Sequence, residues 1–311
     1  MSILLAVILP VFLVIGLGFA AARRGMISEA GTDGLMRFAQ TFAVPCLLFQ
    51  ALASLDLGQS FDLRLMGSFY AGSFACFVLG LLGSRLLFGR PWEDAVAIGF
   101  VALFSNSLLL GLPITERAFG ADSTRANFAI IAIHSPFCYA VGITAMELAR
   151  AHGAPLGAVP LKIARGLLSN PMVIGILLGL AVNLSGLPLP RVVADGVALL
   201  VPAALPAALF GLGGVIARYR LEGDVPTILF ATALSLVVHP AVTWWLGGLA
   251  DLPRDAFRSS VITAAMAPGA NAYLFAAMYG RAERVAASSV LLGTALSVLT
   301  AAGWLALLSR G

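Results

Sequence analysis

The chain has 311 residues, of which 60% are hydrophobic and 11% are charged, and its mean hydropathy is +0.97. About 25% of the residues in a soluble domain are charged, so this composition excludes a water-soluble protein and predicts one embedded in a lipid bilayer. The net charge of +4 does not indicate a nucleic-acid partner, because the basic residues lie in short turns and form no patch.

Long apolar segments predict membrane-spanning helices rather than barrel strands, because a helix needs about 20 residues to cross the hydrocarbon layer. We expect an all-α membrane protein with ten such helices. Their expected ranges are Ile3–Ala22, Leu35–Ala53, Leu65–Phe88, Ala95–Phe119, Ala126–Arg150, Ile163–Leu184, Val192–Ala217, Val225–Leu249, Phe257–Tyr279 and Val285–Leu308.

The first span is predicted to be a membrane helix and not a cleaved signal peptide, because Arg23 and Arg24 follow its apolar run instead of preceding it. With the N-terminus outside, most Lys and Arg residues fall on the cytoplasmic side, which places both termini outside the cytoplasm. The longest non-apolar stretch, 151–161, is then a cytoplasmic connector between halves 1–150 and 162–311. Because each half has an odd number of spans, the halves are expected to form an inverted repeat.

The fourth span contains Ser105, Asn106 and Ser107, followed by Gly111 and Pro113. Proline removes a backbone N–H and clashes with the carbonyl four residues earlier, and glycine lets the backbone loosen. We therefore expect an interrupted helix whose polar side chains bind freed backbone groups or a ligand. The alternative is a proline-kinked helix in which these side chains bond their own backbone.

The ninth span contains a second interruption, formed by Pro268, Gly269, Ala270 and Asn271. Asn271 is expected to cap the half-helix that begins there, although a simple kink is again the alternative. Interrupted spans at matching positions of two halves are typical of a transporter's binding site.

The two interruptions also predict the type of ligand. The N-terminus of a half-helix carries roughly +0.5 of a charge, and no Arg or Lys lies near either interruption, so backbone dipoles, Asn and Ser would hold a carboxylate. The expected substrate-binding residues are Ser105, Asn106, Ser107, Gly111, Pro113, Pro268, Gly269, Ala270 and Asn271.

Two histidines, His134 and His239, lie near prolines in apolar spans and are candidates for proton coupling, although each could equally be a neutral packed residue. The three cysteines have neither a disulfide framework nor metal-ligand spacing. We expect no metal and no cofactor. Because motifs for zinc, nucleophilic or phosphate chemistry are missing from the sequence, we also do not expect an enzyme.

Four segments together carry a family resemblance that extends over essentially the whole chain. They are Phe42-Ala43-Val44-Pro45-Cys46-Leu47-Leu48-Phe49, Ser105-Asn106-Ser107 with Gly111-Leu112-Pro113, Asn170-Pro171, and Ala267-Pro268-Gly269-Ala270-Asn271-Ala272. With these segments the chain resembles the auxin efflux carrier family, including its bacterial members often called malonate or carboxylate permeases.

The resemblance implies two inverted five-helix repeats in which spans four and nine are broken and cross, an architecture similar to that of bile-acid sodium symporters. It also implies a scaffold of spans one, two, six and seven, which often mediates homodimers, and a transport domain of spans three to five and eight to ten. The implied substrates are small organic anions such as dicarboxylates and indole acetate.

We therefore expect a secondary transporter of mono- or dicarboxylates, malonate- or auxin-like, that works by alternating access in the inner membrane. Its expected partners are the organic anion and the lipid bilayer. The alternatives are an ion-coupled symporter of another small organic solute and a channel, although spans one, three and ten offer little polar lining for a pore. A membrane enzyme or sensor is disfavoured by the missing catalytic groups and the missing soluble output domain.

Overall fold

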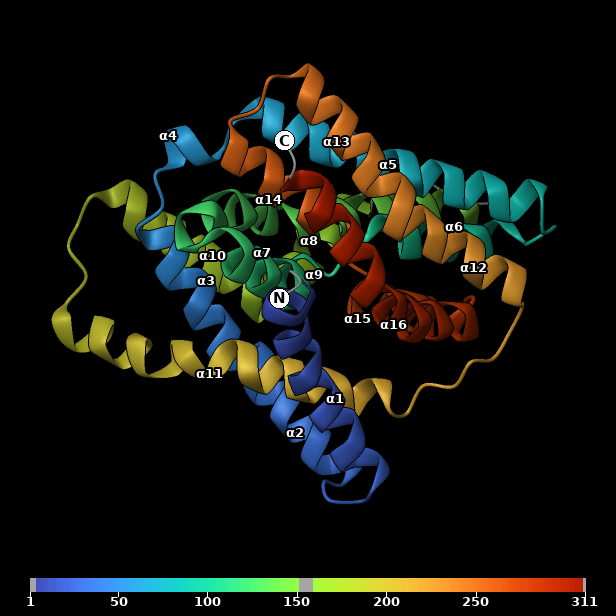
Figure 1. The fold of residues 1–311 in the computed structure, drawn as a ribbon, viewed down its shortest axis with the longest axis horizontal. Helices are drawn as coiled ribbons and strands as arrows, with labels where there is room; N and C mark the ends of the chain where they lie inside the picture. The colour runs from blue at the N-terminus through green and yellow to red at the C-terminus, as the bar shows by residue number, and fades with distance from the viewer. Residues whose placement is uncertain (1–3, 151–158, 310–311) are drawn as a thin grey trace. The chain divides into compact units, whose positions relative to one another are not determined.

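The computed structural model describes residues 4–150 and 159–309, and these ranges are built from helices (Figure 1). The chain forms two compact units, of which the first comprises Met1–Pro10, Phe61–Pro160 and Tyr219–Gly311 and the second comprises Val11–Ser60 and Leu161–Arg218. Each unit is therefore assembled from both halves of the sequence. Most of the expected connector, residues 151–158, lies outside the described ranges.

The helices of the first unit are η1 (Leu4–Ile8), α5 (Leu63–Leu86), α6 (Trp92–Leu103), η3 (Ser107–Gly111), α7 (Leu112–Phe119), η4 (Ala121–Ser123), α8 (Thr124–Arg150), α12 (Val225–Ala233), η6 (Leu234–Val238), α13 (His239–Leu249), α14 (Arg254–Ala264), α15 (Ala270–Tyr279) and α16 (Glu283–Leu308). Those of the second unit are α2 (Glu29–Phe38), η2 (Ala39–Ala43), α3 (Val44–Ala53), α4 (Leu57–Ser60), α10 (Pro171–Ser185) and α11 (Arg191–Ile216), together with most of α1 (Leu9–Arg23) and α9 (Val159–Leu168).

Within residues 4–150 and 159–309, seven helical segments are long and apolar enough to cross a membrane. They are Ala6–Arg23, Glu29–Ala53, Leu63–Leu86, Ala121–Arg150, Arg191–Ile216, Val225–Leu249 and Glu283–Leu308. The other three expected spans contain shorter helices: α9 and α10 in one, α6 with α7 in another, and α14 with α15 in the last. The prediction of an all-α membrane protein is confirmed to this extent, while ten spans in inverted repeats stay a prediction.

Prolines explain where the helices widen into π-helical turns. In the described ranges η1, η2, η3 and η6 each end two residues before a proline, namely Pro10, Pro45, Pro113 and Pro240. A proline ring clashes with the carbonyl four residues earlier and offers it no N–H. The preceding turn relieves this by widening, so that the Leu112 N–H reaches the carbonyl of Ser107, five residues back.

Glycines bring the helices of the second unit close together. A Cβ atom on Gly179 of α10 would lie 2.6 Å from the carbonyl oxygen of Phe49 on α3, and one on Gly175 would lie 2.5 Å from that of Pro45. Glycines spaced by four residues leave one face of a helix flat, which is the usual way for apolar helices to pack tightly. Helix α11 packs against both α2 and α3 in the same unit (Figure 1).

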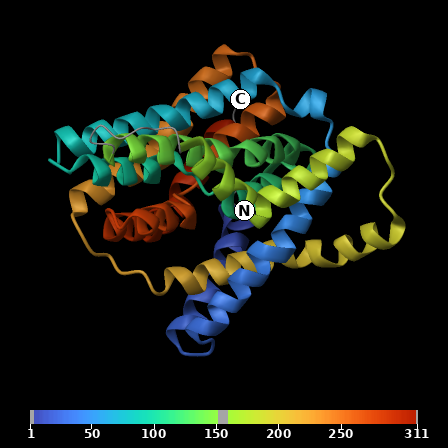
Figure 2. The same ribbon diagram turned by 180° about the vertical axis from the view of Figure 1, so that it is seen from behind.

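In the first unit, α5 and α6 are packed side by side and α5 also packs against α13 (Figure 2). Their close approach again depends on glycine, because a Cβ atom on Gly80 of α5 would lie 3.0 Å from the Cα atom of Gly99 on α6. Helix α6 therefore lies deeply buried, and its C-terminal end is held inside the unit.

Candidate binding site at two helix breaks

Two membrane segments of the first unit are interrupted deep inside it. Helix α6 ends at Leu103, and helical structure resumes with η3 at Ser107. Helix α14 ends at Ala264, and α15 begins at Ala270. The residues between these helix ends are buried, so their backbone polar groups need partners within the protein.

The two interruptions pair with each other. Ser105 and Pro268 form an isolated antiparallel bridge, so the segments Phe104–Asn106 and Ala267–Gly269 lie side by side in opposite directions. We call this pair of segments the bridge. It joins residues more than half the chain apart, and it fixes the end of α6 next to the start of α15.

Two backbone hydrogen bonds close the bridge. The Asn106 N–H donates to the Ala267 carbonyl at 2.8 Å, and the Gly269 N–H donates to the Phe104 carbonyl at 3.1 Å. These bonds flank the central pair, which in this antiparallel pattern does not use its own N–H groups. Pro268 therefore fits the centre of the bridge without loss, because the N–H that proline lacks is not needed there.

Buried serines from neighbouring helices bind the carbonyls that precede the bridge. The Ser73 hydroxyl of α5 donates to the Leu103 carbonyl at 3.0 Å, and the Ser235 hydroxyl of η6 donates to the Met266 carbonyl at 3.3 Å. Leu103 is the last residue of α6 and Met266 lies two residues past the end of α14, so neither carbonyl has a partner within its helix, and both are satisfied from outside it. The freed backbone groups at both helix ends are thus anchored by protein contacts.

The polar residues of the first interruption bond mainly to one another and to their own backbone. The hydroxyl oxygens of Ser105 and Ser107 lie 2.9 Å apart, and the Asn106 carboxamide oxygen accepts from the Leu109 N–H at 3.3 Å. Asn106 therefore caps η3, which was the alternative interpretation of this segment. The Ser107 hydroxyl also donates to the Ser105 carbonyl at 3.3 Å.

The expectation that Asn271 caps the second half-helix is wrong. The N-cap of α15 is Gly269, and no described side chain caps this end, because Asn271 lies two residues into the helix. The N-terminal amides of α15 therefore keep the positive end of the helix dipole uncovered by side chains. Asn271 is half-buried, and its carboxamide oxygen lies 3.5 Å from the hydroxyl of Tyr139, a long contact for this pair of groups.

Gly111 and Pro113 do not form the interruption itself. The break lies earlier, at 104–106, and both residues lie within the helical stretch formed by η3 and α7. Proline is tolerated at the first positions of a helix, and here the π-helical turn absorbs its clash. Of the nine expected binding residues, these two are farthest along the chain from the bridge.

The two histidines lie at different distances from the bridge. His134 of α8 is buried, and its Nε2 atom donates to the Ser105 carbonyl at 3.1 Å. His239 is also buried but faces the carbonyl of Phe69 at 3.4 Å, and its Nδ1 atom has no hydrogen-bond partner among the described residues. The Phe69 ring contacts both imidazoles, with centroids 5.7 Å from His134 and 5.0 Å from His239.

Sequence reasoning missed the side chains that surround the bridge. Tyr139 of α8 faces Asn271 and packs near two stacked rings, Phe100 and Phe275, whose centroids are 3.9 Å apart. Gly293 of α16 leaves room for the ring of Pro268. These residues are aromatic or small residues in apolar runs, and only the tertiary contacts distinguish them from ordinary packing residues.

A buried polar cluster supports the same region. The Asn127 amide of α8 donates to the hydroxyls of Thr115 on α7 and Thr263 on α14, while its oxygen accepts from Ser259. One side chain thus ties a half-helix of each interrupted segment to α8. No Asp, Glu, Lys or Arg occurs at positions 95–115 or 259–280, and no metal-binding group of three or more His, Cys, Asp or Glu side chains was found in the described ranges.

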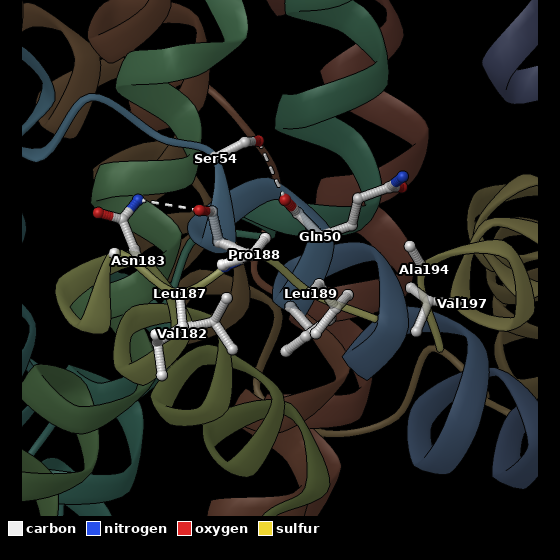
Figure 3. A pocket seen from close by; sticks show the side chains of 12 residues that line it. Gln50, Ser54, Val182, Asn183, Leu187, Pro188, Leu189, Ala194 and Val197 are labelled. Carbon is white, nitrogen blue, oxygen red and sulfur yellow. Dashed lines mark hydrogen bonds between the residues drawn. The ribbon is translucent and has the colours of Figure 1, made fainter. Parts of the chain in front are cut away.

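A separate cavity of about 580 Å³ lies in the second unit, between the end of α3 and the loop that joins α10 to α11 (Figure 3). Its polar side chains bond to nearby backbone: Asn183 donates to the carbonyls of Leu52 at 2.9 Å and Leu55 at 2.8 Å, and Ser54 donates to that of Gln50 at 3.1 Å. Asn183 and Ser54 thus satisfy backbone carbonyls at the C-terminal end of α3, which is a structural role. We therefore place the candidate binding site at the bridge.

Interrupted helices that meet in the interior of a helical membrane protein are typical of multi-pass membrane transporters. The family described as "Membrane transport protein" matches residues 3–156 and 156–305, so the chain belongs to this family, the auxin efflux carrier family. The resemblance seen in the sequence is therefore confirmed.

Three relatives match over nearly their whole length. The chain is 24% identical to the "Putative malonate transporter" of Rhizobium meliloti (strain 1021), over 100% of this chain and 98% of the relative. It is 24% identical to an "Uncharacterized transporter" of Methanothermobacter thermautotrophicus, over 96% of each chain. It is 20% identical to "Auxin efflux carrier component 8" of Arabidopsis thaliana, over 94% of this chain and 93% of the relative.

Proposed function

We propose that this protein is a secondary transporter of small organic anions and that the bridge is its substrate site. The observation that carries this proposal is the meeting of two uncharged helix breaks inside the first unit, where the N-terminus of α15 has no side-chain cap. A buried helix N-terminus attracts anions, and it does so without a fixed positive charge that would hold them too tightly for release.

The substrate carboxylate would accept hydrogen bonds from the first amides of α15 and from the Asn271 carboxamide. In this proposal the Ser107 hydroxyl and the Asn106 amide nitrogen, which come from the first interruption, complete the polar surface. Ser105, Pro268, Gly269 and Ala270 contribute backbone, while Gly111 and Pro113 act at a distance by shaping η3. These roles assign all nine residues predicted from the sequence to one site.

We also propose that the interrupted segments are the crossing fourth and ninth spans of two inverted five-helix repeats. The pattern around the bridge supports this, because each side repeats the same contacts. A serine from the preceding span, Ser73 on one side and Ser235 on the other, binds the carbonyl two residues before the bridge centre. Two equivalent sets of contacts around antiparallel segments are what a twofold axis would produce.

The two units suggest how the transporter moves. The second unit holds the helices expected to form the scaffold, and the first unit holds the bridge and the helices expected to form the transport domain. In this proposal the first unit carries the anion between the two faces of the inner membrane by alternating access, the scaffold mediates a homodimer, and both termini lie outside the cytoplasm.

The substrate class follows from the site and its relatives. A site without Lys or Arg suits one or two carboxylates held by dipoles, and one relative carries the name of a malonate transporter and another that of an auxin efflux carrier. We propose mono- or dicarboxylates of this kind. His134, which donates to the bridge carbonyl of Ser105, is the nearer candidate for proton coupling, and His239 is the more distant one.

The test is uptake of labelled malonate and indole acetate into proteoliposomes by the wild type and by Asn271→Ala. We expect saturable uptake by the wild type and a loss of about tenfold or more in the variant, because a hydrogen bond to a charged group is lost. Tyr273→Phe is the matched control, since Tyr273 lies on the same helix but packs on Tyr219. Asn271→Ala should unfold at the same temperature as the wild type, which would show that the loss of uptake does not come from misfolding.

Three outcomes would contradict parts of this proposal. Normal uptake by Asn271→Ala removes that residue from the site. Flux that never saturates indicates a channel. Uptake of neutral but not anionic solutes, driven by sodium or by a proton gradient, indicates an ion-coupled symporter of another solute. Measurements at two pH values, with and without sodium, separate these cases.

A further inference from the structure

Two serines outside the predicted site make the same contact on opposite sides of the bridge. The carbonyl of Leu103 lies two residues before Ser105, and the carbonyl of Met266 lies two residues before Pro268. Each accepts a hydrogen bond from a serine hydroxyl on a neighbouring helix. Both serine side chains are fully buried.

These contacts satisfy carbonyls at or just beyond the two helix ends. Leu103 is the last residue of α6, and Met266 lies two residues past Ala264, the last residue of α14. A carbonyl at such a position has no donor within its own helix, and in an apolar interior no water replaces that donor. The bridge amides of Asn106 and Gly269 then bind the very next carbonyl on each side.

The two serines are also linked to each other through the packing of α5. Ser73 and Cys76 lie one turn apart on α5, and the Cys76 thiol donates to the carbonyl of Leu234, the residue that precedes Ser235. Helix α5 packs directly on η6. Helix α5 therefore carries one of the two serines, Ser73, and packs on the turn that carries the other, Ser235.

We propose that Ser73 and Ser235 are paired positioning residues, which hold the two helix ends so that the bridge forms and the N-terminus of α15 points at the substrate. The proposal rests on the function proposed above. Other hydroxyls of the same membrane segments differ: Ser68 of α5 donates to Leu65 within its own helix, and Thr232 of α12 has no partner among the described residues.

The first test is amide hydrogen exchange of the full-length protein in nanodiscs. In Ser73→Ala and in Ser235→Ala, we expect the amides of Asn106 and Gly269 to exchange about five- to tenfold faster than in the wild type, because the carbonyl next to each acceptor has lost its anchor. Ser68→Ala and Thr232→Val are the matched controls and should leave these amides unchanged. Unchanged exchange in both alanine variants overturns the proposal.

The second test separates positioning from general stability. We expect each alanine variant to raise the KM for carboxylate uptake about tenfold while its thermal unfolding temperature stays near that of the wild type. Ser73→Thr and Ser235→Thr keep the hydroxyl and should restore much of the affinity. Ser73→Cys and Ser235→Cys keep a weaker S–H donor without the extra methyl group and should restore part of it. Faster exchange with an unchanged KM overturns the positioning role.

Failure of the proposed function would be distinguishable from failure of this inference. If the wild type transports no carboxylate, the proposed function is wrong. The exchange rates of the bridge amides then decide alone whether the two serines hold the helix ends, because that measurement needs no substrate.

Discussion

Gly293 on α16 shows how much the bridge depends on a single small residue. A Cβ atom at this position would lie 2.8 Å from the Cδ atom of Pro268. The proline ring is tied to the backbone at both ends and cannot turn away, so an added methyl group would push the bridge itself. We predict that Gly293→Ala lowers carboxylate uptake about tenfold and destabilises the protein by about 1–3 kcal/mol, measured by chemical unfolding.

Gly303 provides the control on the same helix. Nothing lies within 4 Å of its Cβ position, so Gly303→Ala should be neutral or should stabilise by up to about 1 kcal/mol through helix propensity. Equal effects of the two substitutions would show that flexibility of α16, and not room for Pro268, explains the loss.

Residue types alone predict candidate site residues, but not their structural roles. The sequence predicts Asn106 and Asn271 as binding residues, since each is a polar side chain at an interruption of an apolar span. Asn106 caps η3, whereas Asn271 lies inside α15 and leaves the helix end to Gly269. The sequence could not decide this, because the position of a cap depends on the residue at which the helix begins.

At the scale of elements, the bridge is closed by two hydrogen bonds, and a single substitution can remove one of them. Gly269 has φ −76° and ψ 165°, a conformation that proline adopts readily. Gly269→Pro would remove the N–H that donates to the Phe104 carbonyl, and it would put the ring Cδ atom in the hydrogen's place, against that carbonyl oxygen. We predict at least a tenfold loss of uptake and a destabilisation of at least about 1–3 kcal/mol, because the bridge must separate here and leave a buried carbonyl unpaired.

Gly269→Ala is the matched control for that prediction. Its Cβ atom would lie 3.5 Å from the Phe104 ring, an ordinary contact distance, and the N–H would remain. Uptake and unfolding free energy should therefore stay close to those of the wild type. A loss in the alanine variant as large as that in the proline variant would mean that the absence of a side chain, and not the hydrogen bond, is what matters.

Prolines predicted the local distortions of the helices better than the positions of the breaks. Each π-helical turn in the described part of the chain precedes a proline by two residues, yet α7 continues through Pro113. The fourth-span break occurs at Phe104–Asn106, where its partner lies far away in sequence. A proline changes one turn through local sterics, but a helix stays broken only where other groups bind its freed backbone.

At the scale of the whole molecule, the chain divides into two compact units, and whether each opens by itself can be tested. Gly179→Ala would place a Cβ atom 2.6 Å from the Phe49 carbonyl oxygen in the second unit. We predict that it speeds amide exchange throughout α3 and α10, with a cost of about 1–3 kcal/mol, while the bridge amides in the first unit exchange as in the wild type.

Gly196→Ala on α11 is the control, because nothing lies within 4 Å of its Cβ position. It should leave exchange unchanged in both units. Faster exchange of the bridge amides in Gly179→Ala would contradict the separation, since it would mean that the two units open together.

The sequence by itself determined that this is a helical membrane protein, and its motifs identified the transporter family, because apolar length, proline, glycine and the scarcity of charge are local properties of the chain. It also located both interrupted segments. Only the tertiary structure decided that these segments pair through Ser105 and Pro268, that Ser73 and Ser235 hold the helix ends, and that α15 begins without a side-chain cap. The bridge and the two serine contacts join residues 30 to 163 positions apart, and periodicity along a sequence carries no information about such pairs.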